Sequence, residues 1–325
     1  MLSKLIDLLN KDVQIVECPD RAAWLRERVA SIGASESAAI LEESSYASPL
    51  SVWQSKVQPE FTESTKRQRT GQIMETAVCE MYRDEYGGEV IQWPSHSLIR
   101  PTDRPYIHAT PDAFLLDDEH DGLGLAQIKT WSPFQRSAWD NGPPLPYQIQ
   151  VQHEMHVTGC QWAMIPVFFD VGGVERFEVP RNDRFIESLL KALEEFWVYV
   201  VDRIEPPVDG TAATAAALAA LHPDDDGTAV ALPEDGDDLL DSLERAKRIE
   251  KLAQQRRRSC ENKLKAWIGD HTYGVTPDGR AVSWKTQSRK EHIVKASTFR
   301  VLRTNCRLPK SIELLESAAP QLTAE

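Results

Sequence analysis

Hydrophobic and polar positions alternate with two different periods over the first 203 residues. The stretch 67–86, "RQRTGQIMETAVCEMYRDEY", places its apolar residues on one side of a helix, which Gly87-Gly88 should end. Further along, the patterns predict strands near 89–99, 105–116 and 123–130, a helix over 147–159, a strand pair at 162–170 and 173–180, and an amphipathic helix over 182–203. This order of helix, three strands, helix and strand predicts an α/β fold.

The N-terminal region gives weaker signals. Residues 1–28 show short helical patterns, with Trp24 on an apolar face. The stretch "SIGASESAAIL" follows at 31–41 and is typical of a Gly-rich turn that leads into a helix. Ser35 is the expected N-cap of that helix, because a serine hydroxyl can accept a hydrogen bond from a free backbone N–H.

The pattern changes after residue 203. Residues 204–236 are rich in Pro, Ala, Asp and Thr; an alanine-rich helix could form in the middle, but the composition favours a linker. Residues 238–269 then place apolar residues mostly three or four apart, which predicts a long helix able to pair with another helix. "YGVTPDGRAVSWKTQ" predicts a hairpin. We therefore expect a core at 1–203, an acidic linker at 204–237 and a helix-and-hairpin appendage at 238–325.

Charge is segregated along the chain. The net charge is −13, but residues 204–241 contain ten acidic residues and no Lys or Arg. Residues 242–310 contain 18 Lys and Arg against six acidic residues. A basic surface therefore persists within an acidic total. The run Arg256-Arg257-Arg258 is either a plain solvated helix face or a contact for phosphates.

Composition excludes several classes of protein. A hydrophobic content of 41% with nine tryptophans is typical of a folded soluble protein, and neither a membrane-spanning run nor a signal-peptide pattern is present. The five cysteines are scattered and form no CxxC pair, which argues against zinc and iron–sulfur sites. We expect a cytoplasmic protein with reduced thiols and no membrane partner.

One hairpin concentrates the candidate chemistry. Asp112 follows Pro111 in "ATPDAFL", and Gln127 and Lys129 flank Ile128 in "LAQIKT". Side chains alternate along a strand, so Gln127 and Lys129 should share a face.

Two predicted helices add further candidates. Glu75 lies on the helix before the hairpin, and Gln150 lies on the helix after it, with Tyr147 and Glu154 at helical spacing on the same side. Alone, each of these residues has an ordinary structural explanation, such as a strand end or a solvated helix face. Their order along the chain favours a joint function.

These residue types suit hydrolysis of a phosphodiester. Carboxylates bind hard cations such as Mg²⁺, and a bound cation lowers the pKa of a water molecule and stabilises charge on the phosphate. A nearby lysine can orient or deprotonate that water and can offset phosphate charge. Glutamine can position water through neutral hydrogen bonds.

Five stretches together resemble a known family. "IGASESAAIL", "RTGQIMETAV", "ATPDAFL", "LAQIKT" and "YQIQVQHEMHVTG" occur in the order found in YqaJ-type viral recombinase nucleases, and more distantly in phage lambda exonuclease, within the PD-(D/E)xK superfamily. The resemblance covers about residues 20–203. Each stretch is weak by itself, but the ordered set is specific. "GVTPDGRAVSWKTQ" also resembles the tail of many YqaJ-type proteins.

The resemblance implies a restriction-endonuclease-like core, with a mixed central sheet flanked by helices. It implies a Mg²⁺-dependent exonuclease, with Mn²⁺ as a substitute, that resects duplex DNA ends 5′ to 3′ in phage-type recombination. It also implies a phage or prophage origin in a bacterial host, a single-strand-annealing partner protein and a ring-shaped homotrimer.

The resemblance also assigns roles to individual residues. Asp112, Gln127 and the backbone carbonyl of Ile128 would be metal ligands, and Lys129 the catalytic lysine. Glu75 and Gln150 would support the catalytic site. A pocket for the DNA 5′-phosphate would be formed by Arg28, Ser35 and Thr110.

Gln127 departs from the family pattern, because an acidic residue normally stands at its position. Glutamine keeps an oxygen of similar reach but loses a charge, so we expect weaker metal binding. Glu154 could replace the missing charge as a further metal ligand. Three functions stay open: an active or weakened nuclease, which we favour; an inactive DNA-end-binding or scaffold protein; and an iron–sulfur nuclease of the CRISPR-associated type, which the scattered cysteines disfavour.

Overall fold

A computed structural model of the chain describes Leu5, Leu8, Leu9, residues 11–61, 63–170 and 172–288, and Leu314–Leu315. The chain forms two compact units, Met1–Leu221 and His222–Glu325. Within the described residues, every helix is either too short or too polar to cross a membrane.

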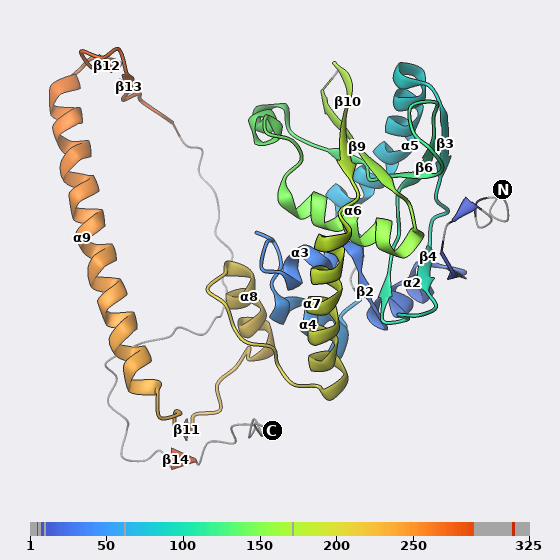
Figure 1. Ribbon diagram of the computed structural model, residues 1–325. Helices are drawn as coiled ribbons and strands as arrows, with labels where there is room; N and C mark the ends of the chain where they lie inside the picture. Colours follow the sequence, from blue (N-terminus) through green and yellow to red (C-terminus); the bar gives the residue numbers. More distant parts are fainter. Residues whose placement is uncertain are drawn as a thin grey trace. The chain divides into compact units, whose positions relative to one another are not determined.

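A six-stranded mixed sheet lies at the centre of the first unit (Figure 1). Its order is β10-β9-β7-β6-β3, with β8 paired to β9 beside the main path. The strands β3, β6, β7 are antiparallel neighbours, β9 runs parallel to β7 and β8, and β10 is antiparallel to β9. Their bounds are β3 Glu89–Gln92, β6 Ala113–Leu116, β7 Gly124–Ala126, β8 Lys129–Thr130, β9 Trp162–Asp170 and β10 Gly173–Pro180. The α/β class with a mixed central sheet is confirmed.

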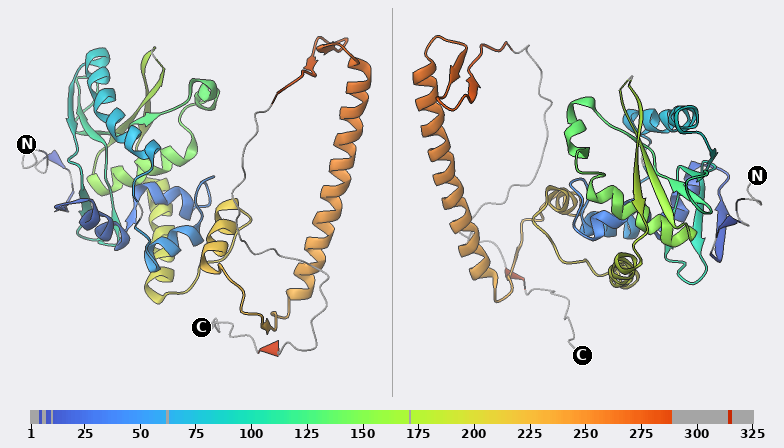
Figure 2. Two further views of the ribbon diagram at one scale, coloured as in Figure 1. Left: turned by 180° about the vertical axis from the view of Figure 1, so that it is seen from behind. Right: turned by 45° about the horizontal axis from the view of Figure 1, so that its top comes forward.

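Helices cover both faces of this sheet, as Figures 1 and 2 show from opposite sides. Along β6, Ala113 and Leu115 join the hydrophobic cluster formed with α5 (Lys66–Tyr86). Phe114 joins the other cluster, which contains the apolar side chains of α6 (Leu145–Thr158). Alternation along one strand therefore divides the core into two layers.

Capping contacts and glycines set the limits of these two helices, and both helices end at the glycines that the sequence indicates. At the start of α5, the Thr65 hydroxyl accepts from the backbone N–H of Gln68, and the Gln68 side chain accepts from the Thr65 backbone N–H. This helix ends at Gly87, which has a φ of +73°. Gly159 ends α6 with a φ of +78°, a conformation that favours glycine over residues with a side chain.

The three strands expected near 89–99, 105–116 and 123–130 are each interrupted. The first is divided into β3 and β4 (Ser97–Pro101), and the second into β5 (Ile107–His108) and β6. The third is divided into β7 and β8 by Gln127 and Ile128. Pro111 has no backbone N–H for a ladder, and the N–H of Ile128 bonds to the Asp112 side chain instead of to a neighbouring strand.

The expectation of short helical patterns in residues 1–28 is met in part. Arg21–Val29 forms the helix α2, which carries Trp24, but Val13–Glu17 forms the strand β1, which pairs antiparallel with β4. The alternating sequence of β1 buries its apolar residues against the β4 strand, and a distant partner of this kind leaves no local signal.

Ser35 is not a helix cap, contrary to the sequence expectation. The chain continues from β2 (Ile32–Gly33), which pairs with β5, into a short 3₁₀ helix, η1 (Ala34–Glu36), and then into α3 (Ser37–Ile40). Ser35 lies inside η1. The Glu36 carboxylate makes the capping contact, because it accepts from the Gly33 backbone N–H at 2.7 Å.

Three further helices complete the first unit. Trp53 of α4 (Pro49–Val57) donates its indole N–H to the Tyr199 carbonyl of α7 (Asp183–Asp202) at 3.0 Å. The helix α8 (Ala212–Leu221) lies inside the segment expected to be a linker and packs against α4 with Ala217 buried. The first unit therefore extends beyond residue 203.

The second unit contains the predicted long helix and hairpin. α9 spans Gly236–Ile268, and the hairpin joins β12 (Tyr273–Val275) to β13 (Ala281–Ser283). Arg256, Arg257 and Arg258 are exposed on α9. Ala229–Val230 forms β11, which pairs with β14 (Leu314–Leu315). The rest of the expected appendage, 289–313 and 316–325, lies outside the described residues.

The packing of α8 makes a prediction about truncated chains. A protein that ends at Leu221 should unfold cooperatively, with a melting temperature near that of unit 1 in the full chain. A protein that ends at Arg203 should melt lower, by at least about 2–4 °C, the shift that a loss of ~1 kcal/mol produces in a domain of this size. Thermal unfolding of both would check this, and equal melting temperatures would show that α8 contributes nothing to the unit.

Candidate active site

Asp112 lies at the centre of the candidate site, in the break between β5 and β6. Its backbone carbonyl accepts from the Trp93 N–H at 3.1 Å, which fixes the chain just before β6. Its Oδ2 accepts from the backbone N–H of Ile128 at 2.6 Å and from Gln127 Nε2 at 2.7 Å. The interruption of β7 and β8 therefore supplies both hydrogen-bond donors to this carboxylate.

Gln127 makes the opposite contact from the one expected of a metal ligand. Its amide nitrogen, not its oxygen, faces Asp112, and Oε1 is buried with no hydrogen-bond partner among the described residues. A half-turn of the amide group would bring Oε1 toward the Asp112 carboxylate. That arrangement would place two acceptors together, so it requires a cation between them.

Lys129 lies on the same side of the sheet as Gln127 and reaches α6. Its Nζ lies 3.5 Å from Gln150 Oε1 and 5.0 Å from the centre of the Tyr147 ring. Gln150 in turn donates to Glu154 Oε1 at 3.0 Å, whereas Oε2 of Glu154 is buried without a partner among the described residues. The helical spacing of Tyr147, Gln150 and Glu154 therefore places all three beside the strand that carries Lys129.

Burial shifts the pKa of each carboxyl group in this region upward. Desolvation raises the pKa of Asp112 to about 7, against the opposing effect of the Lys129 charge. Desolvation, with a contribution from the Asp112 charge, raises the pKa of Glu154 to about 8. Burial also raises the pKa of Glu75, which the Lys129 charge partly offsets. Negative charge is therefore costly here without a nearby cation.

A cleft of about 430 Å³ connects this region with the predicted phosphate pocket. Arg28 and Thr110 line it together with Glu75 and Asp112. These residues come from α2, from the segment before β6 and from α5. The structure therefore brings four of the predicted site residues to one cavity, although they are far apart in the sequence.

Arg28 is held beside this cleft by two neighbours. Its guanidinium carbon lies 4.7 Å from the centre of the Trp24 ring, one turn earlier on α2. Its Nη2 donates to Ser35 Oγ at 3.3 Å. Arg28 and Ser35 are therefore in contact, as a shared phosphate pocket requires, whereas Ser35 itself does not line the cleft.

Three polar residues beneath this pocket were not indicated by the sequence. Lys56 and His108 are buried there, and Ser31 Oγ lies 2.8 Å from His108 Nδ1. Nothing in the motif spacing marks Lys56, because its partners are two backbone carbonyls and the Glu36 carboxylate, which lies 20 residues earlier in the chain. His108 carries a weak signal, since a histidine in a short apolar strand needs a polar partner.

The oxygen atoms of the site fit a hard cation in chemical type but not as a preformed cage. No group of three or more His, Cys, Asp and Glu side chains suited to a metal occurs in the described part of the chain. The unpartnered oxygens of Gln127 and Glu154 and the desolvated Asp112 carboxylate are, however, the atoms that Mg²⁺ prefers. A cation would offset the cost of burying negative charge on Asp112 and Glu154, the cost that raises the pKa values of both carboxyl groups.

Comparison with known proteins supports the resemblance seen in the sequence. Residues 23–161 match the family model described as the YqaJ-like viral recombinase domain. The uncharacterized protein YqaJ of Bacillus subtilis (strain 168) is 25% identical over 293 residues, which cover 88% of each chain.

Two solved structures are also similar in part. The alkaline exonuclease LHK-Exo from Laribacter hongkongensis is 20% identical with a TM-score of 0.45, over 56% of this chain and 93% of that chain. A phage related exonuclease from Haemophilus somnus 129PT is 13% identical with a TM-score of 0.37, over 62% of this chain and 93% of that chain.

The matched region spans α2 to the end of α6 and includes every candidate residue from Arg28 to Glu154. The ordered motifs, the family model and the relative from Bacillus subtilis agree. The chain is therefore similar to YqaJ-like viral recombinase proteins.

Proposed function

We propose that the protein is a Mg²⁺-dependent deoxyribonuclease that resects the ends of linear duplex DNA, from 5′ to 3′, during phage-type recombination. The observation that carries this proposal is the single cleft lined by Arg28, Thr110, Glu75 and Asp112. A cation at one end of the cleft and a terminal phosphate at the other would fit one nucleotide end.

In this proposal Asp112, the Gln127 amide oxygen and the Ile128 backbone carbonyl would hold Mg²⁺, or Mn²⁺ in its place, with Glu154 as a further ligand. When bound, the ion supplies a water of lowered pKa and offsets charge on the scissile phosphate. Lys129 would orient a water molecule for attack, would take its proton when the amine is neutral, and would offset charge on the phosphate, and Gln150 holds Lys129 in place. Glu75 adds negative charge beside Lys129.

The other end of the cleft holds the DNA terminus. Arg28 makes a charge-assisted contact with the 5′-phosphate, supported by the Ser35 hydroxyl and Thr110. The exposed arginines of α9 add phosphate contacts outside the core. A single-strand-annealing protein would take up the strand left by resection, in the cytoplasm of a bacterial host. As in the ring-shaped family members, three copies would surround the duplex.

A second candidate function is DNA-end binding without cleavage. The hydrogen bond from Gln127 to Asp112 favours it, because the site is then partly satisfied without any cation. This candidate retains the phosphate pocket but has no hydrolytic activity, so a cleavage assay with Mg²⁺ and with Mn²⁺ separates the two.

Lys129 should act in the reaction and not in folding, because its side chain is only half-buried and its bond to Gln150 is long. Lys129→Ala should reduce cleavage of linear duplex DNA by at least about 100-fold, the range of a general acid–base group. Its melting temperature should stay near that of the natural protein. Lys191→Ala, on the exposed side of α7, is the matched control. Full cleavage by Lys129→Ala would refute the assignment of this site.

The terminal phosphate should matter for cleavage, because Arg28 would lose its ionic partner on a hydroxyl end. Duplex DNA with a 5′-phosphate should be digested faster than the same duplex with a 5′-hydroxyl, by about ten-fold or more for a charge-assisted contact of ~1.5–3 kcal/mol. Arg28→Ala should remove the difference. Equal digestion of both duplexes by the natural protein would show that Arg28 and Ser35 do not form this pocket.

Gln127→Glu should lower the Mg²⁺ concentration needed for cleavage, because a carboxylate restores charge at the ion. Glu154→Ala should weaken Mg²⁺ binding more in the natural protein than in Gln127→Glu, if Glu154 compensates for the glutamine. Calorimetric Mg²⁺ titrations and cleavage assays on all four combinations would be run at pH 8.5, where Asp112 and Glu154, with pKa values of about 7 and about 8, are ionised.

The same four proteins separate the remaining outcomes. Equal Mg²⁺ affinity with Gln127 and with Glu at this position would mean that residue 127 does not touch the ion. Cleavage gained only by Gln127→Glu would identify the natural protein as the DNA-end-binding candidate.

A further inference from the structure

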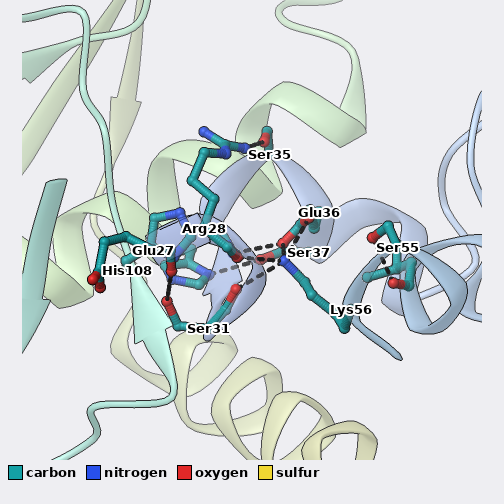
Figure 3. Close-up of polar contacts among 12 residues, drawn as sticks. Glu27, Arg28, Ser31, Ser35, Glu36, Ser37, Ser55, Lys56 and His108 are labelled. Carbon is teal, nitrogen blue, oxygen red and sulfur yellow. Dashed lines mark hydrogen bonds and ion pairs between the residues drawn. The ribbon is translucent and has the colours of Figure 1, made fainter. Parts of the chain in front are cut away.

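Lys56 is a buried lysine beneath the turn that carries Arg28 and Ser35. Its side chain is 2% exposed, and the hydrogen bonds of its ammonium group go to Arg28, Ser31 and Glu36 (Figure 3). Nζ donates to the carbonyl oxygens of Arg28 and Ser31, both at 2.8 Å. It also contacts the Glu36 carboxylate, at 2.8 Å to Oε1 and 2.7 Å to Oε2. The three N–H groups of the Lys56 ammonium therefore all donate to one turn of the chain, residues 28–36.

Lys56 holds two backbone carbonyls at the point where this turn leaves α2. α2 ends at Val29, and the Arg28 and Ser31 carbonyls fall in the part of the chain where helical hydrogen bonding stops. Lys56 bonds to both of them, and Glu36 bonds to the Gly33 N–H a few residues later. Lys56, which bonds to the Arg28 carbonyl and forms an ion pair with Glu36, thus joins the end of α2 to η1.

The position of this turn determines where the Arg28 side chain can lie. A Cβ atom added to Gly33 would lie 2.9 Å from His108 Nε2 and 3.4 Å from Arg28 Nη2. The guanidinium is therefore packed against the turn, between Trp24 and Ser35. A small shift of residues 30–33 would push it away from the Ser35 hydroxyl.

Stability alone does not explain a lysine at this position. Burying an ion pair gives little net stabilisation compared with well-packed apolar residues, and desolvation lowers the pKa of Lys56. A methionine or leucine on α4 would fill the same volume. What an apolar residue could not do is hold two carbonyls and a carboxylate in one fixed arrangement.

We propose that Lys56 is a positioning residue of the terminal-phosphate pocket, which fixes the turn between Arg28 and Glu36 so that Arg28 and Ser35 meet a DNA 5′-phosphate together. The inference rests on the proposed function of Arg28 and Ser35. Lys56 does not touch the DNA. Its effect reaches the substrate only through the backbone of the turn.

The test compares cleavage of blunt duplexes that differ only in a 5′-phosphate or a 5′-hydroxyl. Lys56→Met retains the length and volume of the side chain but removes its donors, and Lys191→Met is the matched exposed control. Lys56→Met should lower the ratio of kcat/KM between the two duplexes by about ten-fold, since small misplacements of a binding group have effects of this size. Most of the loss should be in KM for the phosphorylated duplex.

A double-variant comparison separates positioning from general destabilisation. Arg28→Ala and Lys56→Met combined should change the ratio no more than Arg28→Ala alone, because both act through the same contact. Lys56→Arg should restore part of the ratio, since it keeps the charge but not the geometry of an ammonium group. A folded Lys56→Met protein with the natural ratio would overturn the proposal, while Arg28→Ala could still confirm the pocket.

Folding of the variants is followed by thermal unfolding. Where Lys56→Met does not fold, Glu36→Gln decides, because the Glu36 side chain is 20% exposed and the change removes only the charge that holds Lys56. Glu36→Gln should then lower the phosphate ratio several-fold. An unchanged ratio, or failure of both variants to fold, would mean that the cluster serves only the fold. No phosphate preference in the natural protein would refute the pocket itself.

Discussion

The carboxylate of Asp112 is the group on which the arrangement of the site depends. It is half-buried at the cleft and its charge is desolvated, so it needs hydrogen bonds or a cation within the protein. The chain provides the hydrogen bonds where two strands are interrupted. Pro111, which has no backbone N–H, precedes β6. Between β7 and β8, the Gln127 backbone N–H still bonds to the Met164 carbonyl of β9, but the Gln127 side chain and the Ile128 N–H both donate to Asp112. The same breaks leave Lys129 beside α6 and open the cleft toward Arg28. An uninterrupted sheet would bury none of these groups in this way.

Gln127 changes the balance of charge around that carboxylate. Three carboxyl groups, from Glu75, Asp112 and Glu154, already have raised pKa values through burial. A fourth at position 127 would add repulsion that only a bound cation could offset. Glutamine instead donates a hydrogen bond to Asp112, and it retains an oxygen that a half-turn of the amide would bring toward a cation. In the proposed nuclease, this residue would add no negative charge to the three carboxyl groups and would bind the metal more weakly than a carboxylate.

Local patterns predicted the elements whose signals are contained in one stretch of sequence. α5, α6, α7 and α9, the β9–β10 pair and the β12–β13 hairpin occur where periodicity and turn residues indicated. The failures share a physical cause, which is dependence on partners distant in the chain. β1 is a strand because of β4, and α8 is ordered because it packs on α4. Ser35 has the residue type of a cap, but Glu36 makes the capping contact.

The candidate site was predictable to a similar extent. The ordered motifs identified Asp112, Lys129 and Gln150, and the structure brings them together with Glu75 and Arg28. No pattern could indicate that the Gln127 amide nitrogen faces Asp112, because the choice depends on whether a cation is present. Lys56 was equally hidden, since two of its three partners are backbone carbonyls and the third, Glu36, lies 20 residues earlier in the chain.

The two ends of the cleft are mechanically connected through α6. Ser37, at the start of α3 and next to Glu36, lies 2.7 Å from Nδ1 of the buried His153, and His153 adjoins Glu154 on α6. The turn held by Lys56 and the helix that carries Gln150 and Glu154 are therefore joined by buried polar contacts as well as by packing. Such contacts tolerate little displacement, because each lost hydrogen bond leaves a buried polar group without a partner. In the proposed nuclease, the fold would thus set the distance between a terminal phosphate at Arg28 and the carboxylates of Asp112 and Glu154, as an enzyme that acts at a fixed distance from a DNA end requires.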